Sequence, residues 1–201
     1  DLLKTLSKLR HLDLSHNKID YHSFYFLNNS LNLNYLNLAL TNLTDEIFNS
    51  ILLLDKFEKI FFINLSFNLI ETIHQNKFSK SIHLSHLDMS HNRISIISNF
   101  SFLNNKNLEY LNLAYNQIKS FKQELFGSNL EAQSSLFQLI LSNNRLLIFD
   151  IVVNFINEDG CLNLESNLLL DFPKSLYKTS SMPYLNMKRN KMKKILNMHF
   201  F

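Results

Sequence analysis

Two carboxylates and four histidines are the side chains of this sequence whose types and spacing could support chemistry. Asp13 and Asp88 both occur within Leu-Asp-x-Ser-His-Asn, and the histidines that flank them are His11, His16, His86 and His91. Two carboxylates about 5 to 9.5 Å apart could act as general acid and base. Histidines about 2 Å from one ion could hold a metal, and a free histidine titrates at about pH 6.5.

The segments that carry these residues are copies of one repeat. The pattern L-x-x-L-x-L-x-x-N-x-L, whose positions we number as slots 1 to 11, recurs eight times. Other apolar residues stand in some leucine slots, and the seventh copy lacks the first leucine, which Asp159 replaces. Successive copies lie 23 to 28 residues apart, within the roughly 20 to 29 residues that are typical of leucine-rich repeats. Slot 9 holds Asn17, Thr41, Asn68, Asn92, Asn116, Asn144, Asn167 and Asn190.

The apolar residues of slots 4 and 6 predict a short strand in each repeat. Their side chains point inward and stack on the next coil, because parallel strands lie about 4.8 Å apart and are joined by long returns. We therefore expect an α/β fold. It is a leucine-rich-repeat solenoid, a curved horseshoe with a parallel β-sheet on the concave face and short helices, turns and loops on the convex face. Residues 1–201 would form a single domain of about eight repeats.

The slot 9 asparagines are expected to be structural. Each stands where a strand ends and the chain turns inward, so its amide can bond backbone groups of neighbouring coils. Thr41 has a shorter side chain with only a hydroxyl, and it predicts a weaker rung in this ladder.

The returns also carry a pattern. Apolar residues are followed five positions later by phenylalanine at Ile73 and Phe78, Ile97 and Phe102, Phe121 and Phe126, and Ile195 and Phe200, which predicts a convex half of the core. Residues 44–57 have apolar side chains at helical spacing behind a candidate Thr44 or Asp45 cap. The return that contains Pro173 predicts a shorter, more extended segment.

This repeat places the candidate catalytic groups apart. Asp13 and Asp88 are three repeats from each other, roughly 14 Å at the strand spacing, and the histidine pairs are separated in the same way. Gly127 and Gly160 are isolated, so no phosphate loop is present. The single Cys161 excludes an internal disulfide framework and a multi-cysteine zinc site. We expect no enzyme, no cofactor and no metal, although a histidine pH sensor stays open.

Aromatic side chains that the core cannot use mark the expected binding surface. Slot 3 points away from the core and holds His11, Tyr35, Phe62, His86, Tyr110, Gln138, Cys161 and Tyr184. Slot 8 adds Phe67 and Tyr115. The predicted ligand-binding residues are Tyr35, Phe62, Phe67, His86, Tyr110 and Tyr115, which would contact a protein ligand or a partner receptor. The alternative is coding bias toward aromatics, or their cover by glycan or another domain.

Two further features concern partners. Sequons occur at Asn28, Asn42, Asn64 and Asn99, a number that chance alone explains in a chain so rich in asparagine. Asn64 would project from the concave strand. The carboxyl-terminal end is basic through Lys174, Lys178, Lys188, Arg189, Lys191, Lys193 and Lys194. It could meet nucleic acid or an anionic glycan, or be an ordinary solvated edge of the repeats.

Strings such as Leu12-Asp-Leu-Ser-His-Asn17 and Leu111-Asn-Leu-Ala-Tyr-Asn116 resemble the typical repeats of animal extracellular leucine-rich proteins, above all Toll-like receptor ectodomains and chaoptin-like adhesion proteins. The resemblance implies a non-catalytic recognition module outside the cell or in the endosomal lumen, as the ectodomain of a membrane-anchored innate immune receptor. A cell-adhesion protein and a cytoplasmic scaffold are the alternatives. With no cysteine-rich cap at either end, we expect a fragment lacking its terminal caps, anchored to a membrane only through segments outside this chain.

Overall fold

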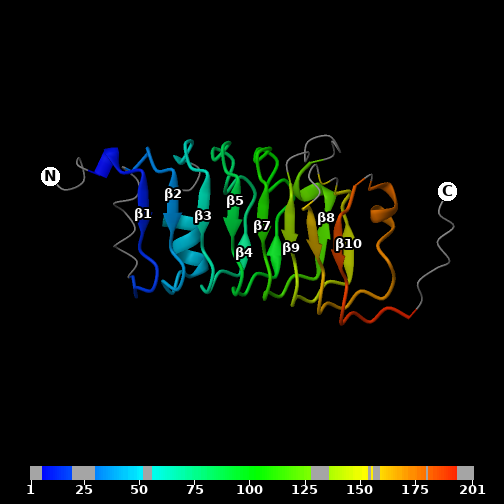
Figure 1. Ribbon diagram of the computed structural model, residues 1–201. Helices are drawn as coiled ribbons and strands as arrows, with labels where there is room; N and C mark the ends of the chain where they lie inside the picture. The colour runs from blue at the N-terminus through cyan, green and yellow to red at the C-terminus, as the bar shows by residue number, and fades with distance from the viewer. Residues whose placement is uncertain are drawn as a thin grey trace.

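The computed structural model describes residues 6–19, 30–51, 56–127, 136–153, 155, 159–179 and 181–193. Eight parallel strands stand side by side in chain order and form one sheet (Figure 1). They are β1 (His11–Asp13), β2 (Tyr35–Asn37), β3 (Phe62–Asn64), β5 (His86–Asp88), β7 (Tyr110–Asn112), β9 (Gln138–Ile140), β11 (Cys161–Asn163) and β12 (Tyr184–Asn186). The predicted leucine-rich-repeat solenoid is confirmed, and we call the face of this sheet the concave face.

The register of the sheet follows the repeat. Each strand spans slots 3 to 5, and equivalent slots pair directly, as His11 does with Tyr35 and Phe62 with His86. The middle residue of each inner strand is fully buried, and its two neighbours are half-buried. This alternation is the period of two that a strand imposes, so slots 3 and 5 face away from the core.

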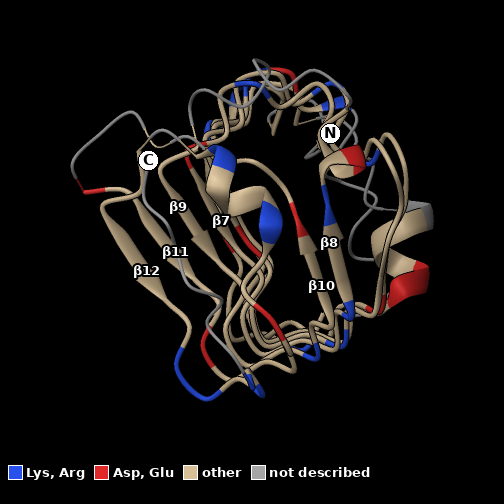
Figure 2. Cartoon of the chain, turned by 90° about the vertical axis from the view of Figure 1, so that its right-hand side faces the viewer, with Lys and Arg blue, Asp and Glu red and all other residues tan. Residues whose placement is uncertain are grey.

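The convex side is built from short elements. Two small parallel sheets pair β4 (Thr72–Ile73) with β6 (Ile96–Ile97) and β8 (Ser120–Lys122) with β10 (Ile148–Asp150). The helical turns are η1 (Leu6–Lys8), the π-helix η3 (Ile47–Ile51), η5 (Gln123–Leu125) and η7 (Lys174–Lys178). Viewed along the solenoid axis, β8 and β10 lie opposite the main sheet, across the core (Figure 2).

Phenylalanine rings fill the convex half of that core. Phe48, Phe78, Phe102 and Phe126 are fully buried, and we call them the phenylalanine spine. Their ring centroids follow one another at 6.3, 6.1 and 5.4 Å. The predicted Phe200 lies outside the described residues. Four successive coils therefore each add one ring to a continuous apolar column.

The helical turn expected in residues 44–57 is present as η3. One of its two cap candidates is excluded, and the return after Pro173 differs from the expectation. Asp45 does not cap the helix that begins beside it, because its carboxylate accepts hydrogen bonds from the Glu71 and Thr72 N–H groups of the next coil at 2.6 and 3.0 Å. The return after Pro173 is not extended, since it forms the 3₁₀ helix η7. At Asp45 contacts between coils override the local pattern.

Candidate functional site

A ladder of slot 9 side chains fixes the geometry of the concave face. In each coil from the third to the eighth, Oδ1 accepts from a backbone N–H of the preceding coil, and Nδ2 donates to a carbonyl of that coil and to carbonyls of its own turn. For Asn92 the partners across the coil boundary are the Ile70 N–H at 3.0 Å and the Leu65 carbonyl at 2.9 Å. The strands are thus held at fixed spacing.

The ladder differs at its amino-terminal end. The Thr41 hydroxyl donates to the Leu38 carbonyl of its own coil at 2.8 Å. Among the described residues, no side-chain bond joins Thr41 to the first coil, and the Asn17 amide bonds only its own turn. Main-chain bonds such as that from the Leu14 N–H to the Asn37 carbonyl, at 2.9 Å, link these two coils.

The turn after each strand projects slot 8 outward. His16, Leu40, Phe67, His91, Tyr115, Asn143, Ser166 and Arg189 all have φ between 52° and 59°. Left-handed backbone costs roughly 1 to 2 kcal/mol for a residue with a side chain, and an N–H bond to the next coil offsets this, as from Phe67 to the Ser90 carbonyl at 3.0 Å. Because Leu40 and Ser166 share this conformation, it belongs to the repeat and not to a site.

Five slot 3 rings form a column that we call the strand stack. Neighbouring centroids along His11, Tyr35, Phe62, His86 and Tyr110 lie 4.0, 4.4, 6.1 and 5.8 Å apart, with interplanar angles of 27° or less. All but the exposed His11 are half-buried. The spacing of the strands sets this separation, and each inner ring covers the faces of its neighbours. The predicted column ends there, because Gln138 and Cys161 follow.

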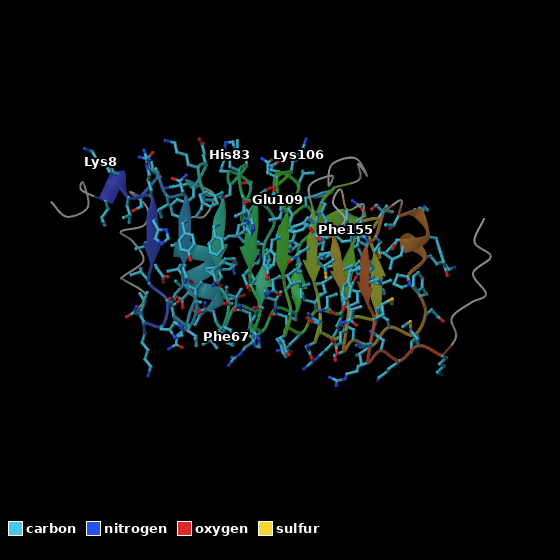
Figure 3. The ribbon with its side chains drawn as sticks, viewed as in Figure 1. Lys8, Phe67, His83, Lys106, Glu109 and Phe155 are labelled. Carbon is cyan, nitrogen blue, oxygen red and sulfur yellow. The ribbon has the colours of Figure 1, made fainter. Side chains whose placement is uncertain are left out.

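Three slot 8 rings form a second column, the turn stack. Phe67, His91 and Tyr115 have centroids 4.1 and 4.2 Å apart and are tilted by 8° and 12°. We predicted Phe67 and Tyr115 to lie beside the slot 3 rings, whereas Phe67 lies on the opposite edge of the sheet from the residues that precede the strands (Figure 3). His91 was not among the predicted binding residues, but its place between two aromatic slots could have indicated it.

A polar column of slot 5 residues separates the two stacks. It consists of Asp13, Asn37, Asn64, Asp88 and Asn112, and we call it the amide column. Asn37 Nδ2 donates to Asp13 Oδ2 at 2.9 Å, and Asn112 Nδ2 donates to Asp88 Oδ2 at 3.0 Å. Hydrogen bonds from the Ser15 hydroxyl and N–H lower the pKa of Asp13, so this carboxylate stays ionised.

Two titratable side chains on this face have raised pKa values. Burial, followed by the charge of Asp88, raises the pKa of Tyr110, so its phenol keeps its proton as a hydrogen-bond donor. Burial likewise raises the pKa of the Cys161 thiol. Asp13 and Asp88 are separated by β2 and β3, and in the described ranges no cluster of His, Cys, Asp or Glu could hold a metal ion.

Comparison with known families now completes the assignment. A family model described as "Leucine rich repeat" matches residues 62–118 and 83–146, and a second one of the same description matches residues 5–21. Together they span just over half of the chain. The chain belongs to the leucine-rich-repeat family. No curated protein matches it in sequence.

Solved leucine-rich-repeat structures share this fold. One of them is the ectodomain of the Arabidopsis thaliana membrane receptor kinase GASSHO1/SCHENGEN3, in complex with CASPARIAN STRIP INTEGRITY FACTOR 2. It superposes with a TM-score of 0.61 and 18% identity, and the match covers 92% of this chain and 24% of that one. The Toll–Spatzle complex of Drosophila superposes with a TM-score of 0.65 and 20% identity, and the match covers 94% of this chain and 29% of that one. The complex of TLR13 with ssRNA13 superposes with a TM-score of 0.55 and 21% identity, and the match covers 96% of this chain and 35% of that one.

These comparisons establish the fold of the repeats. The leucine-rich-repeat solenoid is a recognition scaffold and not a catalytic fold. Our chain spans only about a quarter to a third of the length of these structures. None of the helices described is long and apolar enough to cross a membrane.

The remaining predicted sites are scattered over the leucine-rich-repeat domain. Asn42 and Asn99 are exposed, Asn64 is half-buried in the amide column, and Asn28 lies outside the described residues. The carboxyl-terminal cations form two groups: Lys174 and Lys178 lie on η7, whereas the others follow β12 (Figure 2). This second group contains Lys188, Arg189, Lys191 and Lys193, and Lys194 is outside the described residues. Arg189 pairs with Glu165 at 3.7 Å.

Proposed function

We propose that this chain is the ligand-recognition part of an extracellular receptor of the Toll-like type, and that it binds a protein through the strand stack, the turn stack and the amide column. The observation that carries the proposal is the pair of ring stacks on either side of a polar column. Phe67 and Tyr115 are 47% and 51% exposed, and exposed aromatic patches of this kind mark interaction surfaces. Tyrosine is also enriched among the residues that dominate binding energy.

The stacks also indicate the chemistry of the partner. Since inner rings cover one another's faces, they present their edges to solvent, where the ring quadrupole is positive. The hydroxyl groups of Tyr35, Tyr110 and Tyr115 lie at the ends of their rings. Such edges attract carbonyl and carboxylate oxygens and the faces of other aromatic rings. A protein loop with acidic and aromatic side chains satisfies both requirements.

The test replaces two rings of the strand stack and one ring of the turn stack. The triple variant Phe62→Ser, Phe67→Ser and Tyr110→Ser should weaken the partner's affinity by at least roughly tenfold, since hot-spot residues contribute about 2 kcal/mol or more each. The partner is first identified as the extracellular protein retained by the immobilised wild-type chain, and its Kd is then measured by calorimetry.

A control variant removes three exposed apolar side chains from elsewhere. Ile96, Leu147 and Tyr177 are at least as exposed and lie outside the strands of the concave sheet. Their triple replacement by Ser should leave the affinity within about threefold of the wild type. Equal affinities of the concave variant and the wild type would defeat the proposal, as would a loss of binding in the control.

Glycosylation tests the proposed location. In the secretory pathway of its own host we expect glycan on Asn28, Asn42 or Asn99, detected as a mass loss on enzymatic deglycosylation that Asn→Gln variants of these sites abolish. A protein from its host with all three sites unmodified would favour the cytoplasmic scaffold. Asn64 Oδ1 accepts from the Ser66 N–H at 2.9 Å within the amide column, so a glycan there would block the proposed surface and contradict binding to it.

The extracellular assignment is supported by likeness to solved receptor structures. The GASSHO1/SCHENGEN3 structure is the ectodomain of a plant membrane receptor kinase, and the Toll structure is bound to Spatzle. An adhesion protein would use the same concave rings. The receptor is favoured because the similar GASSHO1/SCHENGEN3 structure is a receptor ectodomain solved in complex with CASPARIAN STRIP INTEGRITY FACTOR 2.

A further inference from the structure

A basic pocket lies on the edge of the sheet where the strands begin. It is lined by Lys8, Arg10, Asn32, Asn34 and Lys59 and has a volume of about 410 Å³. Lys8 ends η1, on the upper edge in Figure 3. We propose that this pocket binds a sulfate group of a sulfated glycan, at a site beside the proposed protein-binding surface.

The architecture of the repeat brings the three cations together. Lys8, Asn32 and Lys59 each precede slot 1 of three successive repeats, and Arg10 and Asn34 occupy slot 2 of the first two. Both positions flank a leucine or isoleucine that points into the core, so their side chains project at the edge. Coils about 4.8 Å apart place these long side chains within reach of one anion.

The part of the chain that the structure describes places no acidic side chain in an ion pair with the cations of the pocket. Lys59 Nζ donates to the neutral Asn32 Oδ1 at 2.6 Å, and among the described residues no carboxylate forms an ion pair with Lys8, Arg10 or Lys59. Glu58 is exposed and does not line the pocket. Oxygen anions with several acceptors bind such groups through charge-assisted hydrogen bonds.

The two asparagines supply the polar contacts of a sugar site. Asn32 Nδ2 donates to the Ser7 carbonyl at 2.6 Å and Asn34 Nδ2 to the Lys59 carbonyl at 3.4 Å, which orients both amides at the rim. Asn34 Oδ1 is then available to accept from a sugar hydroxyl. A sulfated sugar presents both an anion and hydroxyl donors.

The neighbouring rings argue against a nucleic acid. Single-stranded nucleic acids gain affinity when bases stack on open aromatic faces. The rings that follow the pocket in the chain are Tyr35 and Phe62, and these stack on each other at 4.4 Å while His11 covers the other face of Tyr35 at 4.0 Å. A flexible polyanion without bases therefore fits the site better.

The experiment measures binding of a heparin-derived hexasaccharide to the whole chain by calorimetry. The triple variant Lys8→Gln, Arg10→Gln and Lys59→Gln should lower the affinity by roughly tenfold or more, because charge-assisted hydrogen bonds are lost. It should also make the affinity less dependent on salt concentration. The control variant Lys174→Gln, Lys178→Gln and Lys188→Gln removes the same charge at the other end and should change the affinity by less than about threefold.

Three other results would overturn the proposal. They are an equal loss in both triple variants, equal binding of the desulfated hexasaccharide, and binding of a single-stranded RNA decamer at least as tight as that of the hexasaccharide. All the replaced side chains are exposed. Each variant's thermal midpoint should therefore match that of the wild type, so that a change in binding reports on the pocket.

Discussion

Phe102→Ala should lower the free energy of unfolding by about 3 to 5 kcal/mol, the range for large-to-small changes of buried aromatic residues. Phe102 is fully buried in the phenylalanine spine, with ring centroids 6.1 Å from that of Phe78 and 5.4 Å from that of Phe126. Each neighbour is anchored in its own coil, so the cavity cannot close easily. The measurement is the midpoint of denaturant unfolding, which should fall. The slope of the unfolding free energy against denaturant concentration should stay unchanged.

Phe100→Ala is the matched control for this prediction. Phe100 is in the same coil, two residues away, and its side chain is exposed. Its loss should cost less than about 1 kcal/mol, as is usual for surface positions. Similar midpoints for the two variants would mean that the spine does not carry the stability of the convex core.

Asn92→Ala should cost about 2 to 3 kcal/mol. The change leaves the buried Ile70 N–H without its acceptor and removes a donor from the Leu65 carbonyl, and a buried group left unpaired costs about 1 to 3 kcal/mol. Hydrogen exchange of the Ile70 amide should accelerate at the same time, which reports the loss at the site of the broken bond.

Asn104→Ala provides the comparison for the ladder. Asn104 is exposed and donates a single bond, to the Ser79 carbonyl at 3.2 Å. Removing it should change the unfolding free energy by less than about 0.5 kcal/mol. If Asn92→Ala were no more costly than Asn104→Ala, the ladder would not couple the coils.

The sequence predicted the strands of this fold well because the repeat has a physical period. Leucines in slots 4 and 6 can be buried only if the residues between them point outward, so the strand bounds at His11–Asp13 and its equivalents follow from the pattern. The phenylalanine spine was also predictable, because Phe78, Phe102 and Phe126 recur at one offset from the strand.

Other parts depend on three-dimensional contacts that no periodic pattern encodes. The separation of Phe67 from the Phe62 column follows from the left-handed turn at slot 8, where φ is 55° for Phe67. Asp45 was misread because its partners, Glu71 and Thr72, lie in the next coil. Lys77 is buried although it is charged, with its Nζ 4.6 Å from the centroid of the Phe48 ring.

The basic pocket shows which signal was overlooked. Lys8, Arg10 and Lys59 fall in the positions around slot 1, and aligning those positions repeat by repeat would have placed the three cations in adjacent coils. The carboxyl-terminal cations are more numerous in the sequence, yet the structure divides them between η7 and the turn after β12. The number of cations in a stretch of sequence thus predicts a basic site less well than cations at equivalent positions of adjacent repeats.

The ring stacks also give the chain an intrinsic optical reporter. The sequence contains seven tyrosines and no tryptophan, so tyrosine dominates its near-ultraviolet absorption. Tyr35, Tyr110 and Tyr115 stand in the two stacks at centroid distances of 4.0 to 5.8 Å from their neighbours. Chromophores held this rigidly produce near-ultraviolet circular dichroism, and a ligand that touches their edges perturbs it. Occupancy of the concave face can therefore be followed in solution without a label.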